Sequence, residues 1–314
     1  MKWIWKALKL LLVTVLFVTA VRCFELVREF RCTAVITLDG TVPGAAEAEE
    51  ICEDEAGEEV LAVCFFWEET ANVFCEENGR SAVVTLVVTE GNPALLVFGG
   101  SELYWREDGC LIDQDTAYSI FGSGQASGQT LWIGGKSYTV CGTFASELPT
   151  VIRSVSDSDE SALTQVAVRA SSTSNLQGKA EQFLTRHGLS GTVISTVYLT
   201  AFAGDLLLLV PLLLIWRLAG HAAGKRTALI QISSLFFLAF CTIGLAFRYF
   251  EIPSDMIPTK WSDFSFWGTW WEEQKNHILL LLTMSLSSAQ THILWNCFVS
   301  LCSSIAAAFL AVLS

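Results

Sequence analysis

Charge is scarce in this 314-residue sequence, because only 16% of its residues are charged whereas soluble domains usually carry nearer a quarter. Basic residues are the scarcer kind, and the formal net charge is −13. Nucleic-acid binding needs many Lys and Arg side chains to neutralise phosphates. We therefore expect no nucleic acid among the partners. The hydrophobic content of 52% points instead to a membrane protein.

Signatures of catalysis are also missing. No G-x-S-x-G motif presents a nucleophile, no C-x-x-C pair is present, and the four His do not cluster with cysteines. The segment from Gly224 to Thr227 resembles the end of a phosphate-binding loop, but Arg226 stands where that loop needs Ser or Thr. We expect no enzyme activity, no catalytic residue, no metal site and no cofactor.

Seven of the ten cysteines fall in or beside the most acidic part of the chain. An odd number leaves at least one thiol unpaired if all the others form bridges. One or two disulfides in an exported domain, and small buried apolar cysteines, are both consistent with the sequence. The seven are Cys23, Cys32, Cys52, Cys64, Cys75, Cys110 and Cys141.

Long apolar runs predict four transmembrane helices, at residues 1–22 and at about 192–216, 228–247 and 293–313. The first run also has the length of a cleaved signal peptide, but no convincing cleavage site follows it, so a retained span is favoured. Lys2, Lys6 and Lys9 precede this run, and the Arg217–Arg226 loop is basic. By the positive-inside rule, both termini are cytoplasmic in a multi-pass protein of the cell membrane.

The acidic region at residues 23–190 is then extracytoplasmic. Its pattern predicts a large α+β domain between spans one and two, with an α/β lobe (residues 23–91 and 149–190) and an inserted β-rich lobe (residues 92–148). Strands are expected at Cys32–Leu38, Val60–Trp67, Val73–Phe74, Ser81–Thr89, Gln129–Ile133, Lys136–Cys141, Val151–Ser154 and Thr164–Arg169, and helices at Gly44–Glu55, Ala117–Phe121 and Leu176–His187.

Tryptophans and phenylalanines gather in the segment Tyr249–His277, which returns to the outer side. Such a cluster suits the membrane–water interface. The apolar run Ile278–Leu286 is too short to cross a membrane. It is interpreted as interfacial, as re-entrant, or as an early extension of the last span.

Asp205 lies near the middle of the second predicted span, where a carboxylate is costly. One interpretation is a proton or ion site. The other is a carboxyl hydrogen-bonded to a hydroxyl of a neighbouring span, such as Ser233, Ser234 or Thr242. Pro211 is expected to kink the same helix.

The stretch from Ser101 to Phe144 has a spacing that resembles the outer domain of MacB/FtsX-type ABC transporter permeases. In that family an Ala-x-x-Leu/Ile-Phe-Gly turn precedes a Gly-x-x-Ile-x-Ile/Val-x-Gly-x-x-Tyr/Phe-x-Val-x-Gly pattern. The matching positions are Ala117, Ile120, Phe121, Gly122, Gly128, Leu131, Ile133, Gly135, Tyr138, Val140 and Gly142. We expect these residues to be structural. Phe121→Ala should cost roughly 3–5 kcal/mol if the ring is buried.

The resemblance implies a transmembrane subunit that couples a separate cytoplasmic ABC ATPase to an extracytoplasmic substrate, such as a peptide, lipoprotein or drug. It also implies a homodimer, or a heterodimer with a second permease, within the lipid bilayer. By position, the candidates for coupling to the ATPase are Arg217, His221, Lys225 and Arg226. The alternative is a non-transport membrane protein whose outer domain senses or binds a ligand or partner.

Overall fold

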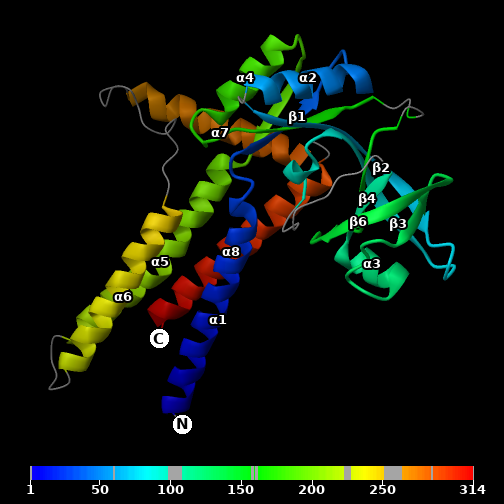
Figure 1. The fold of residues 1–314 in the computed structure, drawn as a ribbon. Helices are drawn as coiled ribbons and strands as arrows, with labels where there is room; N and C mark the ends of the chain where they lie inside the picture. The colour runs from blue at the N-terminus through cyan, green and yellow to red at the C-terminus, as the bar shows by residue number, and fades with distance from the viewer. Residues whose placement is uncertain are drawn as a thin grey trace. The chain divides into compact units, whose positions relative to one another are not determined.

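The computed structural model describes residues 2–58, 61–97, 108–156, 159, 162–222, 228–250, 264–283 and 286–313. The chain divides into two compact units. One unit comprises Cys32–Ser195 and Trp261–His292, and the other comprises Met1–Arg31, Thr196–Lys260 and Ile293–Ser314. We call the first the strand unit, because it contains all the strands that the structure describes, and the second the helical unit (Figure 1).

Nine strands form one sheet in the first unit, in the order β3-β7-β4-β6-β5-β2-β8-β1-β9. Because β2 also pairs with β3, the six strands from β3 to β2 close into a hydrogen-bonded ring, and β8, β1 and β9 extend the sheet beyond it. Strands from the segments predicted as the α/β lobe and strands from the segment predicted as the β-rich lobe therefore belong to the same sheet. The strands are β1 (Thr33–Leu38), β2 (Ala62–Phe74), β3 (Ser81–Gly91), β4 (Gly109–Asp113), β5 (Thr130–Ile133), β6 (Lys136–Phe144), β7 (Thr150–Ser154), β8 (Gln165–Arg169) and β9 (Gly191–Ser195).

Strand β2 is one continuous element, so the prediction of two strands at Val60–Trp67 and Val73–Phe74 was wrong. The polar residues Glu68 to Thr70 suggested a break, but their backbone pairs with β3 without interruption. The first half of β2 also pairs with β8, and its end at Val73–Phe74 pairs with β5. Between these two pairings, the polar residues Glu68 to Thr70 pair with β3, and this pairing keeps the strand continuous because backbone hydrogen bonds do not depend on the side chains.

The helix α3 (Gln114–Phe121) is fixed at both ends by its sequence. The Asp113 carboxylate accepts hydrogen bonds from the backbone N–H groups of Asp115 and Thr116, each at 3.0 Å, which is a typical N-cap. The other carboxylate oxygen accepts the Thr150 N–H at 2.8 Å and so ties α3 to β7. Gly122 ends the helix with φ of 77°, a left-handed conformation that favours glycine.

The predicted hairpin at Gly134-Gly135 is confirmed. Both glycines have positive φ, at 57° and 84°, as a two-residue turn between right-twisted strands requires. The turn joins β5 to β6 in the register Ile133↔Lys136 to Thr130↔Thr139.

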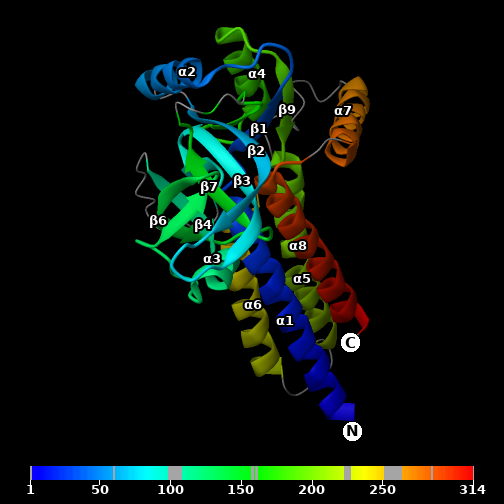
Figure 2. The ribbon, with the colours of Figure 1, turned by 90° about the vertical axis from the view of Figure 1, so that its right-hand side faces the viewer.

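Two helices lie together over one face of the sheet, α2 (Ala45–Glu58) and α4 (Leu176–Arg186) (Figures 1 and 2). The ring of Phe183 on α4 lies 6.4 Å from the ring of Phe65 on β2, and both side chains are fully buried. The opposite face of β2 contributes Cys64 and Phe66 to a buried cluster with Val87, Leu111, Phe144, Ile152 and Ala289. The sheet is therefore covered on both faces.

The helical unit comprises α1 (Lys2–Arg28), α5 (Val197–Ala222), α6 (Ala228–Tyr249) and α8 (Ser288–Leu313) from Ile293 onward. Small residues lie where the helices meet. Ala20 of α1 and Ala203 of α5 pack with Phe24, Leu207 and Tyr249, and a second cluster contains Val13, Val210, Ala307 and Ala308. Small side chains let apolar helices approach closely, which is how helices pack within membranes.

Three described helices are long and apolar enough to cross a membrane: Ala7–Arg28, Val197–Arg217 and Ser288–Val312. In α6 the apolar part is shorter, Leu235–Tyr249, so the fourth span remains a prediction. The second predicted span starts too early at Thr192, because Gly191–Ser195 forms β9 and pairs with β1. The segment 251–263 lies outside the described residues, and Phe264–Thr283 forms one helix, α7.

The side chains of Ile120 and Phe121 provide a test of the core around α3. Ile120 is fully buried, whereas Phe121 is only partly buried, so the condition for a large cost at Phe121 is not met. We expect Ile120→Ala to lower the free energy of unfolding by about 2–5 kcal/mol and Phe121→Ala to lower it clearly less. Urea unfolding of the detergent-solubilised chain measures both, and equal losses would contradict this packing.

Candidate functional site

The last apolar helix, α8, begins with a capping box. The hydroxyl of Ser287 accepts the N–H of Gln290 at 3.2 Å, and the Gln290 side-chain oxygen accepts the N–H of Ser287 at 3.0 Å. Both side chains are buried. The motif Ser-Ser-Ala-Gln before a long apolar run therefore fixes the start of the helix through reciprocal hydrogen bonds.

Glu68, from the middle of β2, binds this same first turn. Its carboxylate accepts the Ser288 N–H at 2.9 and 3.1 Å and the Ser288 hydroxyl at 2.7 Å. A carboxylate at a helix N-terminus also interacts favourably with the helix dipole. Ala289, the next residue, belongs to the buried cluster of the sheet. The start of α8 is thus held by the strand unit through both a polar and an apolar contact.

Burial raises the pKa of the Glu68 carboxyl, and the hydrogen bonds from Ser288 oppose the shift. A small enclosed crevice of about 10 Å³ lies beside Glu68, Ser146, Thr150 and Ser288. That volume holds about one water molecule. The arrangement is therefore a structural junction and has no room for a substrate.

A second polar junction holds α1 against α6 in the helical unit. The Glu25 carboxylate accepts the Tyr249 hydroxyl at 2.6 Å and Arg248 Nε at 2.9 Å, and Arg28 lies 3.2 Å away. The Phe24 and Tyr249 rings meet edge to face at 5.4 Å. Both helices end here, so their C-terminal ends lie at the same level.

Gly204 of α5 lies against this junction. A Cβ at Gly204 would come within 2.8 Å of the Tyr249 carbonyl oxygen and 2.9 Å of the Phe24 ring. Only glycine permits such an approach. Three helices therefore meet at a point where one added methyl group would have to displace a backbone.

An acidic hollow of about 750 Å³ opens in the strand unit beside α2 and the end of β3. Burial, and secondly the Glu49 carboxylate, raise the pKa of Glu90. Burial chiefly raises the pKa of the Cys52 thiol to about 12, so this cysteine stays protonated at neutral pH. The charged side chains that line the hollow are Glu49, Glu53, Glu55, Glu90 and Arg169. The hollow has the size of a small-molecule pocket and an excess of negative charge.

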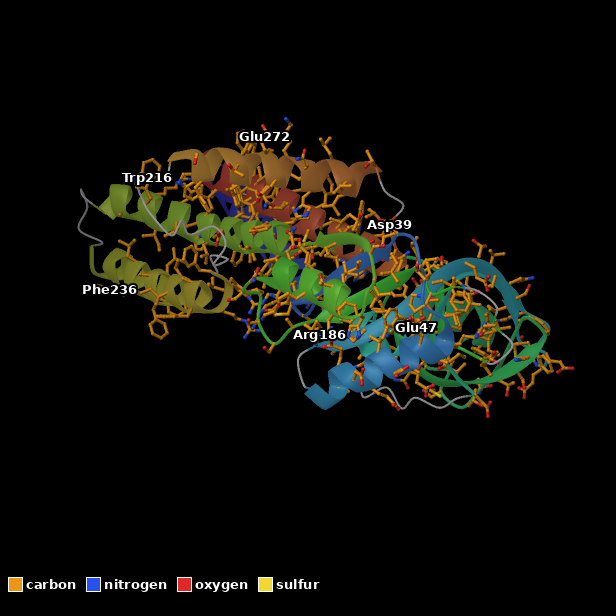
Figure 3. All side chains as sticks on the ribbon, turned by 90° about the horizontal axis from the view of Figure 1, so that it is seen from above. Asp39, Glu47, Arg186, Trp216, Phe236 and Glu272 are labelled. Carbon is orange, nitrogen blue, oxygen red and sulfur yellow. The ribbon has the colours of Figure 1, made fainter. Side chains whose placement is uncertain are left out.

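The hollow also borders a buried ion pair between α2 and α4. Glu55 has a side chain only 1% exposed, and its Oε1 lies 2.6 Å from Arg186 Nη1 and 2.9 Å from His187 Nε2. Arg186 is labelled in Figure 3. These contacts hold the two helices together on the sheet.

The residues of the sequence motif form core and turns in the strand unit. Ala117, Tyr138 and Val140 are buried, Gly122, Gly128 and Gly135 have positive φ, and Gly142 lies opposite Leu111. The Arg153 guanidinium lies 5.7 Å from the centre of the Tyr138 ring. Arg153 also pairs with Asp159 at 2.7 Å. Burial tends to raise the pKa of Asp159, but the hydrogen bonds from Arg153 and Ser156 outweigh it and hold that pKa below its usual range.

The predicted coupling residues lie at or beyond the end of α5. Arg217 donates a hydrogen bond from Nη1 to the Ala311 carbonyl in the last turn of α8. His221 falls in the last turn of α5, but its side chain lies outside the described residues, as do Lys225 and Arg226 entirely.

Asp205 lies in α5, and its Oδ1 is buried without a hydrogen-bond partner among the described residues. The Thr242 hydroxyl donates to the Leu238 carbonyl. The hydrogen-bonded interpretation, through Ser233, Ser234 or Thr242, and the proton or ion interpretation both stay predictions.

Sequence reasoning missed both polar junctions. Glu68 and Ser288 are separated by 220 positions, so no local pattern brings them together. The capping box at Ser287–Gln290 was visible in the sequence and would have placed the start of α8 five residues before Ile293.

No protein-family model matches the chain, and no curated protein matches it. Solved structures do match. The extracellular domain of the noncanonic ABC-type transporter YknZ from Gram-positive bacteria has 15% identity and a TM-score of 0.39, over 51% of this chain and 97% of that one. The periplasmic region of MacB from Actinobacillus actinomycetemcomitans has 12% identity and a TM-score of 0.42, over 56% and 94%.

A third match is a domain described as part of a permease protein from Porphyromonas gingivalis. It has 15% identity and a TM-score of 0.37, over 52% of this chain and 90% of that one.

The raised pKa of Glu68 predicts a pH-dependent stability. The folded chain binds a proton at Glu68 more tightly than the unfolded chain does. Protonated Glu68 therefore contributes to the free energy of unfolding below about pH 4.5, and this contribution is lost as pH rises through the folded pKa. Glu68→Gln should remove this loss, so wild type should weaken relative to the variant as pH rises above 4.5. Urea unfolding over this range measures it, with the exposed Glu69→Gln as control. Parallel curves for wild type and Glu68→Gln would contradict the assignment.

Two helical glycines provide a matched test of the close approach at α5. Gly204→Ala should lower the stability of the helical unit by about 1–3 kcal/mol, because the added methyl collides with Tyr249 and Phe24. Gly244→Ala, in α6, meets nothing within 4 Å and should be neutral or stabilising. Thermal unfolding in detergent compares the two. Equal changes would show that the three helices do not meet at Gly204.

Proposed function

We propose that the chain is a permease-like transmembrane subunit of an ABC-type transporter. It couples a separate cytoplasmic ATPase to the handling of an extracytoplasmic peptide, lipoprotein or drug. The observation that carries the proposal is the order of the elements: apolar α1, the strands β1 to β9, then α5, α6 and α8. The motif from Ala117 to Gly142 supports it from within the strand unit.

Contacts within the helical unit support an up-and-down arrangement of four spans. The C-terminal ends of α1 and α6 meet at Glu25, and the end of α5 meets the end of α8 through Arg217. The second pair of ends carries the basic Arg217–Arg226 loop, and the positive-inside rule supports a cytoplasmic position for that loop and for the C-terminus. The strand unit then lies outside.

Exposed aromatic side chains on α6 support a membrane environment for this helix as well. Phe236 (labelled in Figure 3), Phe240 and Phe247 are 73%, 77% and 89% exposed. Such a surface suits lipid or a second permease subunit in a homodimer or heterodimer. In this arrangement α6 is the third of four spans along the chain.

The two polar junctions support a mechanical role. Motion of the cytoplasmic ends of the spans would reach the strand unit through α8, whose first turn is fixed to β2 by Glu68. The coupling residues at the cytoplasmic end are Arg217, His221, Lys225 and Arg226.

The acidic hollow favours a second function, in which the outer domain of a non-transport membrane protein senses or binds a ligand. Its size and excess of carboxylates suit a small cationic ligand. This function needs no ATPase.

Co-purification separates the two. The tagged chain, isolated in mild detergent from its native cells, should retain an ABC ATPase identified by mass spectrometry. Reversing the charge of the loop with Lys225→Glu and Arg226→Glu should reduce the recovered ATPase several-fold, since the cytoplasmic contact is lost. Lys275→Glu on α7 is the matched control and should leave the recovery unchanged. Isolation of the wild-type chain without any ATPase would overturn the transport function and favour ligand binding.

A further inference from the structure

Helix α7 (Phe264–Thr283), which belongs to the strand unit, carries an apolar face that the rest of this unit leaves largely exposed. At 100° per residue, Trp267, Trp270, Trp271, Ile278 and Leu281 fall within one third of its circumference, interrupted only by Gln274. Three of them are largely exposed, at 46% for Trp267, 62% for Trp271 and 54% for Ile278. An exposed face of this kind marks an interaction surface.

Over residues 265–276 the opposite face of α7 is polar and acidic, and it carries Ser265, Thr269, Glu272, Glu273 and Asn276. In the last turns of α7, Leu279 and Leu280 occupy this face. Glu272 (labelled in Figure 3) pairs with Lys275 at 3.4 Å, and both side chains are more than half exposed. The charged residues at the middle of the helix exclude a transmembrane position, since each would cost about 2.5–3.5 kcal/mol at the centre of a bilayer.

The chain itself fixes where the end of α7 lies. Only four residues separate Thr283 from Ser288, the first residue of α8. At about 3.6 Å per residue, this link holds the end of α7 within roughly 18 Å of the outer end of α8. The inference that the end of α7 lies near the membrane rests on the part of the proposed function in which α8 crosses the membrane, and it does not depend on an ATPase.

We propose that α7 lies flat in the outer membrane–water interface and that its Trp267–Trp271–Ile278 face binds phospholipid. Tryptophan suits this depth, because its ring is apolar while its indole N–H bonds to headgroups or water. Ile278 and Leu281 reach the acyl chains next to it. The acidic opposite face does not attract anionic lipid, so zwitterionic phospholipid is sufficient for binding.

This surface gives the outer part of the protein a membrane contact of its own. Helix α7 ends at Thr283, and four residues separate it from Ser288 in the turn that Glu68 binds. Lipid held by α7 thereby restrains the same end of α8 that the strand unit holds.

Photocrosslinking of the full chain in vesicles of dioleoylphosphatidylcholine tests the proposal. Benzoylphenylalanine replaces Trp271 on the apolar face, Glu273 on the polar face, or Phe298, a 58% exposed residue of α8. All three sites are exposed, so the substitutions should leave folding intact. Mass spectrometry should find phospholipid adducts at positions 271 and 298, several-fold above those at position 273.

The three positions keep the possible failures apart. Adducts with phospholipid at position 298 but with protein at position 271 would overturn the lipid contact of α7 and show that a second copy or another part of the chain covers it. Equal phospholipid labelling at positions 271 and 273 would overturn the flat orientation. Absence of phospholipid adducts at position 298 would instead overturn the membrane position of α8, and with it the proposed function.

Discussion

The carboxylate of Glu68 on the first turn of α8 is the contact on which the rest of this structure depends. Hydrogen bonds to a charged group each contribute about 1.5–3 kcal/mol. Burial of the carboxylate offsets much of that gain, as its raised pKa indicates. The contact therefore mainly fixes the first turn of α8 on β2 within the strand unit.

Two features of the sheet explain why β2 presents Glu68 at that point. The strand is long, and its pairing with β3 continues through its polar middle, which therefore stays extended. Its apolar residues, Phe65 and Phe66, are buried on opposite faces under α4 and in the core cluster with Ala289. The same strand thus belongs to the closed ring, pairs with β8 of the extension β8-β1-β9, and binds the first turn of α8 through Glu68.

Local chemistry in the sequence was sufficient for several elements. The Gly134-Gly135 turn needs positive φ at both positions, Gly122 ends α3, and long apolar runs mark α1, α5 and α8. Long-range pairing was not predictable in this way. β9 looked like the start of a span because its pairing with β1 leaves no local pattern, and Phe121 looked like core although Ile120 takes that place. The Glu68–Ser288 and Glu25–Tyr249 contacts join residues more than 200 positions apart.

A double-mutant cycle between Glu68 and Ser288 tests the central claim most directly. The free energy of unfolding is measured for wild type, Glu68→Ala, Ser288→Ala and the double variant in the same detergent. If the carboxylate holds the first turn of α8, the two changes should be coupled by about 1.5–3 kcal/mol. Additivity within about 0.5 kcal/mol would contradict the claim and would leave α8 attached by apolar packing alone.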